Sequence, residues 1–349
     1  MRAAILILAV LLPTFAFADD GAPAGGDDAV PAAAVAAASA QPPRPVVGPT
    51  ERKRRGSMVG YIDDATIDDH VRVRFDVAGD NNVPDRAEFF YAQCGCNFAG
   101  APGPGNPGAG DLVTDLRFQE FNVNAQYALK TRSLKNRIAV YGTIPVRFVQ
   151  PHGFLGQTFT PPLSNTFTNS SGLGDIRAGV KAAIINDEDS TLTAQVEGFF
   201  QSGDAKKGLG TNHASIEFAL LDRQKMSERA QLEVQVGDWH PIGGSKTQGG
   251  LSYSGDVFFY GFGPSYEVYS NERVSIWPIV ELVGWHVFGG QEQDAGVLRS
   301  AEGVNVVNIK VGARAYIDTR SSIYIGWGRA LTDARWYQHI VRFEYRYSF

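Results

Sequence analysis

The sequence predicts an all-β protein: a transmembrane, antiparallel, up-and-down β-barrel of about 12 strands. Two observations carry this prediction. From residue 70 onward, segments of alternating polar and apolar residues recur, and many are about as long as a tilted membrane strand. The connections between them alternate between long, often glycine-rich stretches and short polar ones, as the loops and turns at the two ends of such a barrel do.

The first element is a secretory signal peptide. Arg2 supplies a positive charge, residues 3–12 are apolar, and Ala16-Phe17-Ala18 is a small-x-small cleavage site. We therefore assign residues 1–18 to a signal peptide and exclude them from the fold. No later segment has the run of roughly 20 apolar residues that a membrane-spanning helix needs.

The second element is a linker. Residues 19–69 begin with Ala, Pro and Gly in low-complexity sequence and carry a basic cluster at residues 51–55, so we expect a disordered periplasmic segment. The basic cluster is a solvated charge run, or alternatively it contacts anionic lipid or the cell wall. Residues 70–349 then form the barrel.

The strands follow in order along residues 70–349, because apolar side chains on one parity oppose polar ones on the other. In one of them, Ile176, Val180 and Ile184 share a face opposite Arg177 and Lys181. The predicted strands are Val71–Ala78, Arg117–Leu129, Arg137–Phe148, Asp175–Ile185, Thr191–Gln201, His213–Leu221, Ala230–Trp239, Asp256–Val268, Val274–Val287, Val306–Ile317, Ser322–Arg329 and Trp336–Phe349.

The connections provide an independent test of the strand assignment. Long ones alternate with short ones along almost the whole barrel, and a β-sandwich would have no reason to keep this rhythm. The last outer loop, 330–335, is the exception because it is short. The segment Arg86–Gln93 also has a strand pattern that would break the parity, and we place it in the first outer loop.

The final strand indicates the location. Phe343, Tyr345, Tyr347 and Phe349 share one face, while charged residues occupy the other; His339 on the apolar parity and Ile340 on the polar one do not fit. A chain that ends this way resembles the assembly signal of bacterial outer-membrane barrels. That resemblance implies an outer-membrane location, contact with outer-membrane lipids, and recognition of Phe349 by the barrel assembly machinery.

The polar parity assigns a set of charged side chains to the lumen. Two interpretations remain open: a lattice of salt bridges that closes the interior, or a polar path for a small solute. The residues predicted to line the lumen are Arg177, Lys181, Glu197, Glu217, Glu233, Glu281, Lys310, Arg314, Arg342, Glu344 and Arg346.

A repeated motif predicts an aromatic site. Residues 239–244 and 285–290 both begin with Trp-His and end with Gly-Gly, at the outer ends of two strands one hairpin apart. By parity, Trp239, Phe259 and Trp285 point inward and would line a solute path at the outer mouth. The alternative is an aromatic girdle at the membrane interface.

A His-x-Ser pair raises an enzymatic alternative. His213 and Ser215 lie on one face of a strand, as do the base and nucleophile of outer-membrane phospholipase, which is also a barrel. They share the lumen side with Glu217, however, and a phospholipase needs its nucleophile where the lipid is. We therefore predict that the protein is not an enzyme.

The composition of the chain narrows the classes of function that remain. The net charge of −5 argues against a nucleic-acid partner. Cys94 and Cys96, separated by one glycine, form a disulfide that staples a loop or, less favoured, a metal site without a nearby histidine. We predict neither a bound metal nor a cofactor.

Two segments resemble a known family. Residues 172–181 (GLGDIRAGVK) and Ser202-Gly203-Asp204 followed by Gly208-Leu209-Gly210 resemble motifs of the "MetA-pathway of phenol degradation" outer-membrane family, although Gln201-Ser202-Gly203-Asp204 departs from the usual Pro-Thr-Gly-Asp pattern. The resemblance covers the barrel from about residue 115 and implies a transporter of aromatic or hydrophobic compounds. The alternative function is a closed structural or adhesive barrel whose outer loops bind a partner.

Overall fold

The structure is a computed structural model of the whole chain. It describes residues 56–82, 112–129, 137–155, 169–204, 207–211, 213–243, 254–294 and 297–349. The signal peptide, residues 19–55, the Arg86–Gln93 segment and the Cys94/Cys96 pair lie outside the described residues, so the predictions for them remain predictions. Among the described residues, no helix is long and apolar enough to span a membrane.

All the predicted strands are present, and the predicted fold class is confirmed. The barrel strands are β1 (His70–Asn81), β2 (Leu112–Ala128), β3 (Ile138–Leu155), β5 (Arg177–Asn186), β6 (Ser190–Phe199), β7 (Ala214–Ser227), β8 (Ala230–Ile242), β9 (Val257–Tyr266), β11 (Ser275–Val287), β14 (Asn305–Tyr316), β15 (Ser321–Ala330) and β16 (His339–Ser348). Four short strands lie beside them: β4 (Ser170–Leu173), β10 (Tyr269–Ser270), β12 (Gln291–Asp294) and β13 (Val297–Ser300).

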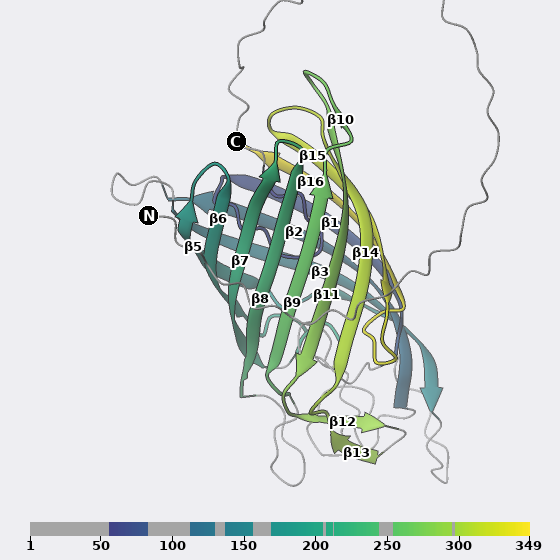
Figure 1. Cartoon of the computed structure of the whole chain (residues 1–349). Helices are drawn as coiled ribbons and strands as arrows, with labels where there is room; N and C mark the ends of the chain where they lie inside the picture. Colours follow the sequence, from purple (N-terminus) through teal and green to yellow (C-terminus); the bar gives the residue numbers. More distant parts are fainter. Residues whose placement is uncertain are drawn as a thin grey trace, which may run out of the picture. The chain divides into compact units, whose positions relative to one another are not determined.

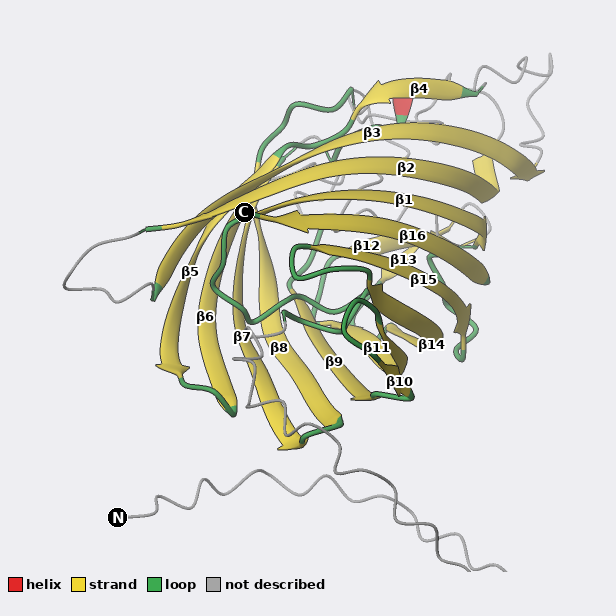
Figure 2. Cartoon of the chain, turned by 90° about the horizontal axis from the view of Figure 1, so that it is seen from above, coloured by secondary structure: helices red, strands yellow, loops and turns green. Residues whose placement is uncertain are grey.

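The barrel is closed by pairing between its first and last strands. Each barrel strand pairs antiparallel with the next in sequence, and β1 pairs with β16 from His70 opposite Ser348 to Gly79 opposite His339. Figure 1 shows the strands from the side, and Figure 2 looks down on the ring that they form. We call the end that carries His70 and Phe349 the turn end, and the opposite end the loop end.

Alternation separates two surfaces along each strand. Side chains such as Phe75, Val180, Phe218 and Phe343 are exposed on the outside, whereas their polar neighbours in sequence are buried inside. A continuous apolar exterior on a closed barrel is what a lipid bilayer requires, because closure leaves no unpaired strand edge.

The misfits in the last strand have a structural explanation. Ile340 is 4 % exposed and packs inside the barrel with Tyr337 in an apolar cluster. His339 faces the other way and stacks on Trp327, with ring centroids 5.6 Å apart. The strand itself begins at His339, later than the predicted Trp336, because residues 336 and 337 turn into the lumen cluster.

Several strands are longer than predicted: β2 begins at Leu112, β3 continues to Leu155 and β7 is extended as well. β7 continues to Ser227, so the connection to β8 is a tight turn and not the eight-residue stretch 222–229. The polar residues at the start of that stretch still pair, with Asp222 opposite Val234 and Arg223 opposite Glu233. The prediction ended the strand too early because successive charged residues are typical of a turn; Arg223 nevertheless continues the inward face of the strand.

The largest difference from the prediction concerns residues 56–69, which we call the lumen segment. The sequence predicts a disordered linker for these residues and a barrel that begins at residue 70. In the structure Met58, Val59, Ile62 and Ala65 are each at most 3 % exposed, and the segment contacts the barrel wall. The lumen segment could not be recognised from the sequence, because it follows the low-complexity residues 19–55 and its short apolar group beside a charge run gives no periodic signal.

Candidate functional site in the barrel lumen

The lumen segment is held in place first by two glutamates of the barrel wall. Glu233 on β8 accepts hydrogen bonds from the Ser57 hydroxyl (2.6 Å) and the Met58 amide (2.7 Å). Glu281 on β11 accepts from the amides of Tyr61 (2.8 Å) and Ile62 (3.0 Å). Because a buried amide left without a partner costs about 1–3 kcal/mol, these carboxylates fix the path of the segment's backbone.

Three arginines bind the opposite polar groups of the segment. Arg314 donates to the Val59 carbonyl at 2.7 Å, and Arg342 donates to the Gly60 carbonyl. Arg346 forms a buried ion pair with Asp64. Since the partners come from β8, β11, β14 and β16, the segment is attached to widely separated parts of the wall and therefore lies inside the barrel.

Asp64 is one of the charges that the segment contributes to this network, beside Asp68, which lies 2.8 Å from Arg346. Burial alone would raise the pKa of its carboxyl, but Arg346, and after it Lys181, outweigh burial and hold the pKa below its usual range. Lys181 also donates to the Asp64 carbonyl at 2.6 Å. Asp64 thus remains ionised, which keeps two buried cations of the wall compensated.

Small residues make room for the segment. A methyl group added at Gly261 on β9 would overlap the Ile62 side chain, and one added at Gly60 would overlap the Tyr324 ring. Ile62 and Val59 pack with Trp277 and Ile279 of β11 in one apolar cluster. The lumen segment is therefore fitted to the wall through apolar packing as well as hydrogen bonds.

The segment forms one side of a cavity of about 200 Å³. Tyr61 and Asp63 belong to it, and the rest of its lining comes from the wall. Two layers can be distinguished along the strands, which place side chains of one face two residues apart. The apolar layer, nearer the loop end, comprises Phe118, Phe199, Phe259, Trp285, Trp336, Tyr337 and Ile340, and the charged layer comprises Arg74, Asp76, Glu120, Arg147, Arg177, Glu197, Glu217, Lys310 and Arg342.

Part of the charged layer is neutralised by tight ion pairs. Arg342 binds Asp76 through two bonds of 2.7 Å. Arg147 pairs with Glu120. Elsewhere in the lumen Arg314 pairs with Glu344 at 2.8 Å. Such pairs satisfy buried charges that would otherwise be costly to keep from water.

The predicted aromatic residues lie on the inner face. Phe259 and Trp285 line the cavity, and Trp239, which is 0 % exposed, packs behind Phe259 in the same apolar cluster. Trp239 also contacts Phe199 edge-on, with ring centroids 6.2 Å apart. Trp239 and Phe259 therefore do not form a lipid-facing girdle, while their part in a solute path remains a prediction.

The structure also places the predicted lumen charges. Each either contacts the lumen segment, lines the cavity or pairs with a residue that does. Sequence reasoning missed Arg72, Arg74 and Asp76 on β1, although they stand on the polar parity of the predicted strand Val71–Ala78. It also missed Glu120 on β2 and Arg147 on β3, which the same parity would have identified.

His213 and Ser215 face inward with Glu217, as expected. Both are 2 % exposed, and within the described part of the chain neither His213 Nε2 nor Ser215 Oγ has a hydrogen-bond partner. They therefore do not form the hydrogen-bonded base and nucleophile that the phospholipase alternative requires.

One group of side chains at the loop end has the composition of a cation site. His152 Nε2 lies 3.5 Å from Asp80 Oδ1 and 3.6 Å from Asp115 Oδ2. Arg117 Nη2 lies 3.8 Å from the same Asp80 oxygen and would compete with a metal ion for it. We assign no metal to this group, and the expectation of a metal-free protein remains a prediction.

Comparison with known proteins leaves the family open. No family model matches the chain, and no curated protein matches it. The resemblance to the "MetA-pathway of phenol degradation" family is therefore not confirmed.

Solved structures resemble the fold. The COG4313 outer membrane channel from Pseudomonas putida F1 matches with a TM-score of 0.52 and 13% sequence identity, over 81% of this chain and 96% of that one. The beta domain of the Bordetella autotransporter BrkA (TM-score 0.45, 11% identity, 81% and 100% coverage) and the translocator domain of the autotransporter NalP from Neisseria meningitidis (0.43, 10%, 81% and 89%) are too dissimilar to carry an argument. The fold of this chain is therefore that of an outer-membrane β-barrel.

Proposed function

We propose that the protein is an outer-membrane channel for passive passage of a small solute with a hydrophobic or aromatic part. The observation that carries this proposal is the lumen cavity of about 200 Å³, which has an apolar layer on one side and a charged layer on the other. An apolar wall with a few directed polar groups is typical of a small-molecule site. A barrel with a purely structural lumen would have no need to leave such a space unfilled.

The direction of passage follows from the barrel's ends. In such barrels the short turns face the periplasm and the longer loops face outward. A solute from outside would reach the apolar layer, then the charged layer, and then the lumen segment. We propose that passage requires the lumen segment to shift, because its backbone is bonded to the wall beyond the cavity.

The second candidate function is a closed barrel whose outer loops bind a partner. The extent of the bonding between the lumen segment and the wall favours it. Glu233, Glu281 and Arg314 already attach the segment to three different strands, and other residues add further contacts.

Single-channel recording in planar bilayers separates the two functions. We expect the wild-type protein to give small openings, and the double variant Glu233→Gln, Glu281→Gln to give larger and longer ones, because an amide binds backbone N–H groups less strongly than a carboxylate does. A matched control is Asp222→Asn, which changes a carboxylate of the wall toward the turn end that binds Gln224 and not the segment. If wild type and variant are both silent while each keeps a heat-modifiable fold, the protein is a closed barrel.

A further inference from the structure

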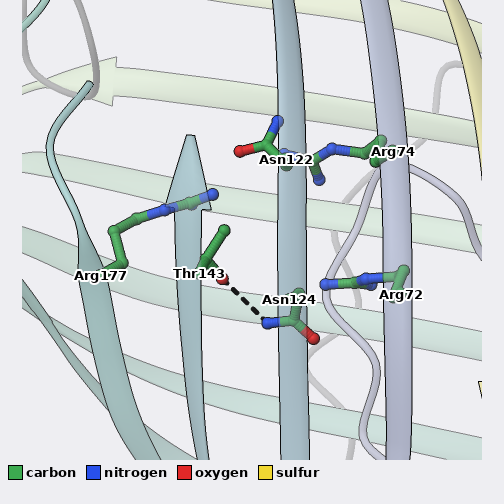
Figure 3. Close-up of a pocket in the computed structure, with 6 residues that line it drawn as sticks. All are labelled: Arg72, Arg74, Asn122, Asn124, Thr143 and Arg177. Atoms are coloured by element: carbon green, nitrogen blue, oxygen red, sulfur yellow. Dashed lines mark hydrogen bonds between the residues drawn. The ribbon is translucent and has the colours of Figure 1, made fainter. Parts of the chain in front are cut away.

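A small polar pocket beside the cavity differs from the rest of the lumen in its charge. It is lined by Arg72 and Arg74 of β1, Arg177 of β5, and the neutral side chains Asn122, Asn124 and Thr143. Its volume is about 10 Å³, close to that of one water-sized group. Figure 3 shows these side chains converging from neighbouring strands, with Asn124 donating to the Thr143 hydroxyl at 2.8 Å.

The carboxylates nearest to this pocket already have tighter partners. Asp76 is bound by Arg342 through two bonds, so its contact with Arg74 Nε is loose, at 3.5 Å. Glu120 pairs with Arg147 and lies 4.0 Å from Arg74 Nη2.

Arg72 and Arg177 also lack a carboxylate that binds them closely. Glu344 bonds to Arg314 at 2.8 Å and lies 3.8 Å from Arg72. Arg177 forms no ion pair within 4 Å among the described residues, and its guanidinium lies over the Phe199 ring at 5.7 Å. The pocket therefore holds three guanidinium groups whose charge is not matched by a dedicated carboxylate.

A second observation points to a missing acceptor. Arg74 Nε is closed off from solvent yet donates no hydrogen bond within the described part of the chain. Buried donors without an acceptor are rare and costly, so one facing a cationic pocket indicates a site for an anionic oxygen.

The pocket adjoins the cavity that carries the apolar layer. Arg74 and Arg177 line both the pocket and the larger cavity, and Phe199 and Trp285 belong to the cavity's apolar layer. Lys310 adds a further cation on that side, 5.6 Å from the Trp285 ring.

Two carboxylates of the cavity lie beside Arg177. Glu197 of β6, the strand that pairs with β5, and Glu217 of β7 line the cavity and stand directly opposite each other. They would repel a second negative charge on the ligand, which therefore carries a single one.

We propose that Arg72, Arg74 and Arg177 form a binding site for the carboxylate of a small aromatic monoanion, whose ring lies against the apolar layer. The proposal rests on the channel function for its biological meaning and specifies the class of solute. Each guanidinium can give two parallel N–H bonds to a carboxylate, which is the geometry that this group favours. Asn122, Asn124 and Thr143 add no charge that would compete for the anion, and the amides of Asn122 and Asn124 already donate to Glu120 and Thr143.

Isothermal titration of the purified protein in detergent tests the proposal with three probes: benzoate, benzamide and acetate. We expect benzoate to bind at least about tenfold more tightly than benzamide, because a hydrogen bond to a charged group is worth roughly one decade or more in affinity. Equal binding of the two would overturn the carboxylate site. Acetate binding as tightly as benzoate would overturn the role of the apolar layer.

Variants identify the residues. Arg177→Gln removes a guanidinium that holds no ion pair within 4 Å among the described residues, and in a variant that keeps its heat-modifiable fold we expect benzoate binding to weaken by about tenfold. Arg177→Lys restores part of that loss through its charge. Arg223→Gln is the matched control, since this buried arginine binds Thr191 outside the cavity. Unchanged benzoate affinity in Arg177→Gln overturns the assignment.

Titration in detergent tests the carboxylate site, whereas conductance in bilayers tests the channel function, so each hypothesis can fail without the other. A protein that binds benzoate but stays electrically silent contradicts the channel function and not the carboxylate site. A protein that conducts without preferring benzoate over benzamide contradicts the site alone.

Discussion

At the scale of single residues, the lumen contains groups that hold the fold and groups that face the cavity. Asp76, Glu344 and Asp64 each bind an arginine closely. Trp285 instead presents its ring to the cavity beside Trp336, with ring centroids 4.9 Å apart.

Trp285 of the apolar layer gives a prediction at the residue scale. Trp285→Ala should weaken binding of benzoate by about 0.5–1.5 kcal/mol, the typical value of an aromatic pair. Trp327→Ala is the control, because Trp327 is 43 % exposed on the outer surface. Titration of both purified variants measures the difference, and a loss equal in the two would remove Trp285 from the site.

Asp64 gives a second residue-scale prediction. Burial raises the pKa of its carboxyl, but Arg346 and Lys181 lower it by more, so the ionised form is favoured in the folded protein. A carboxyl with a lowered pKa contributes stability that is present above its unfolded pKa of about 3.9 and is lost only as the pH falls further.

We therefore expect the difference in conductance between the wild type and Asp64→Asn to be constant between neutral pH and about pH 5, a unit above the ordinary Asp pKa. Asp64→Asn should raise the conductance throughout this range, because breaking a buried ion pair costs about 3–5 kcal/mol. Recordings at several pH values measure both effects. A difference between wild type and Asp64→Asn that disappears between pH 7 and pH 5 would contradict the assignment of Asp64 as a charge that holds the segment.

At the scale of elements, the lumen segment and β9 fit each other through a glycine. Gly261→Leu should push Ile62 out of its place and increase the conductance, because an added Cβ already overlaps that side chain. Gly289→Leu is the matched control, since an added Cβ there meets nothing within 4 Å. If Gly261→Leu folds with normal heat-modifiability and conducts as the wild type does, the segment does not limit passage.

Strand positions could be predicted from the sequence far better than the contents of the lumen. Period-two alternation located every barrel strand, because each has one face against lipid and one inside. It could not locate the lumen segment, whose Gly60 and Asp63 follow no period and whose contacts with Glu233 and Gln235 span more than 170 residues of the chain. The pairing of Arg342 with Asp76 was equally hidden, since it depends on the closing register between β16 and β1.

At the scale of the whole molecule, closure of the ring depends on the last strand, which pairs with β1 along its length. Phe349 is 61 % exposed, and its amide donates to the Asp69 carbonyl at 3.1 Å. We expect deletion of Phe349 to reduce the folded, heat-modifiable fraction in cells and to leave refolding into liposomes nearly unchanged, because a single terminal bond contributes about 1 kcal/mol. An equal loss in both assays would mean that Phe349 stabilises the barrel and is not recognised by the assembly machinery.

The covalent connection between the lumen segment and β1 has a consequence for kinetics. Asp69 is followed directly by His70, the first residue of β1. A segment released from Glu281 therefore stays tethered to the barrel wall and close to its binding partners. Its effective concentration then remains on the order of millimolar, whatever the dilution of the protein. A solute competes with a tethered ligand that cannot diffuse away, and we expect openings to be brief and to recur in bursts.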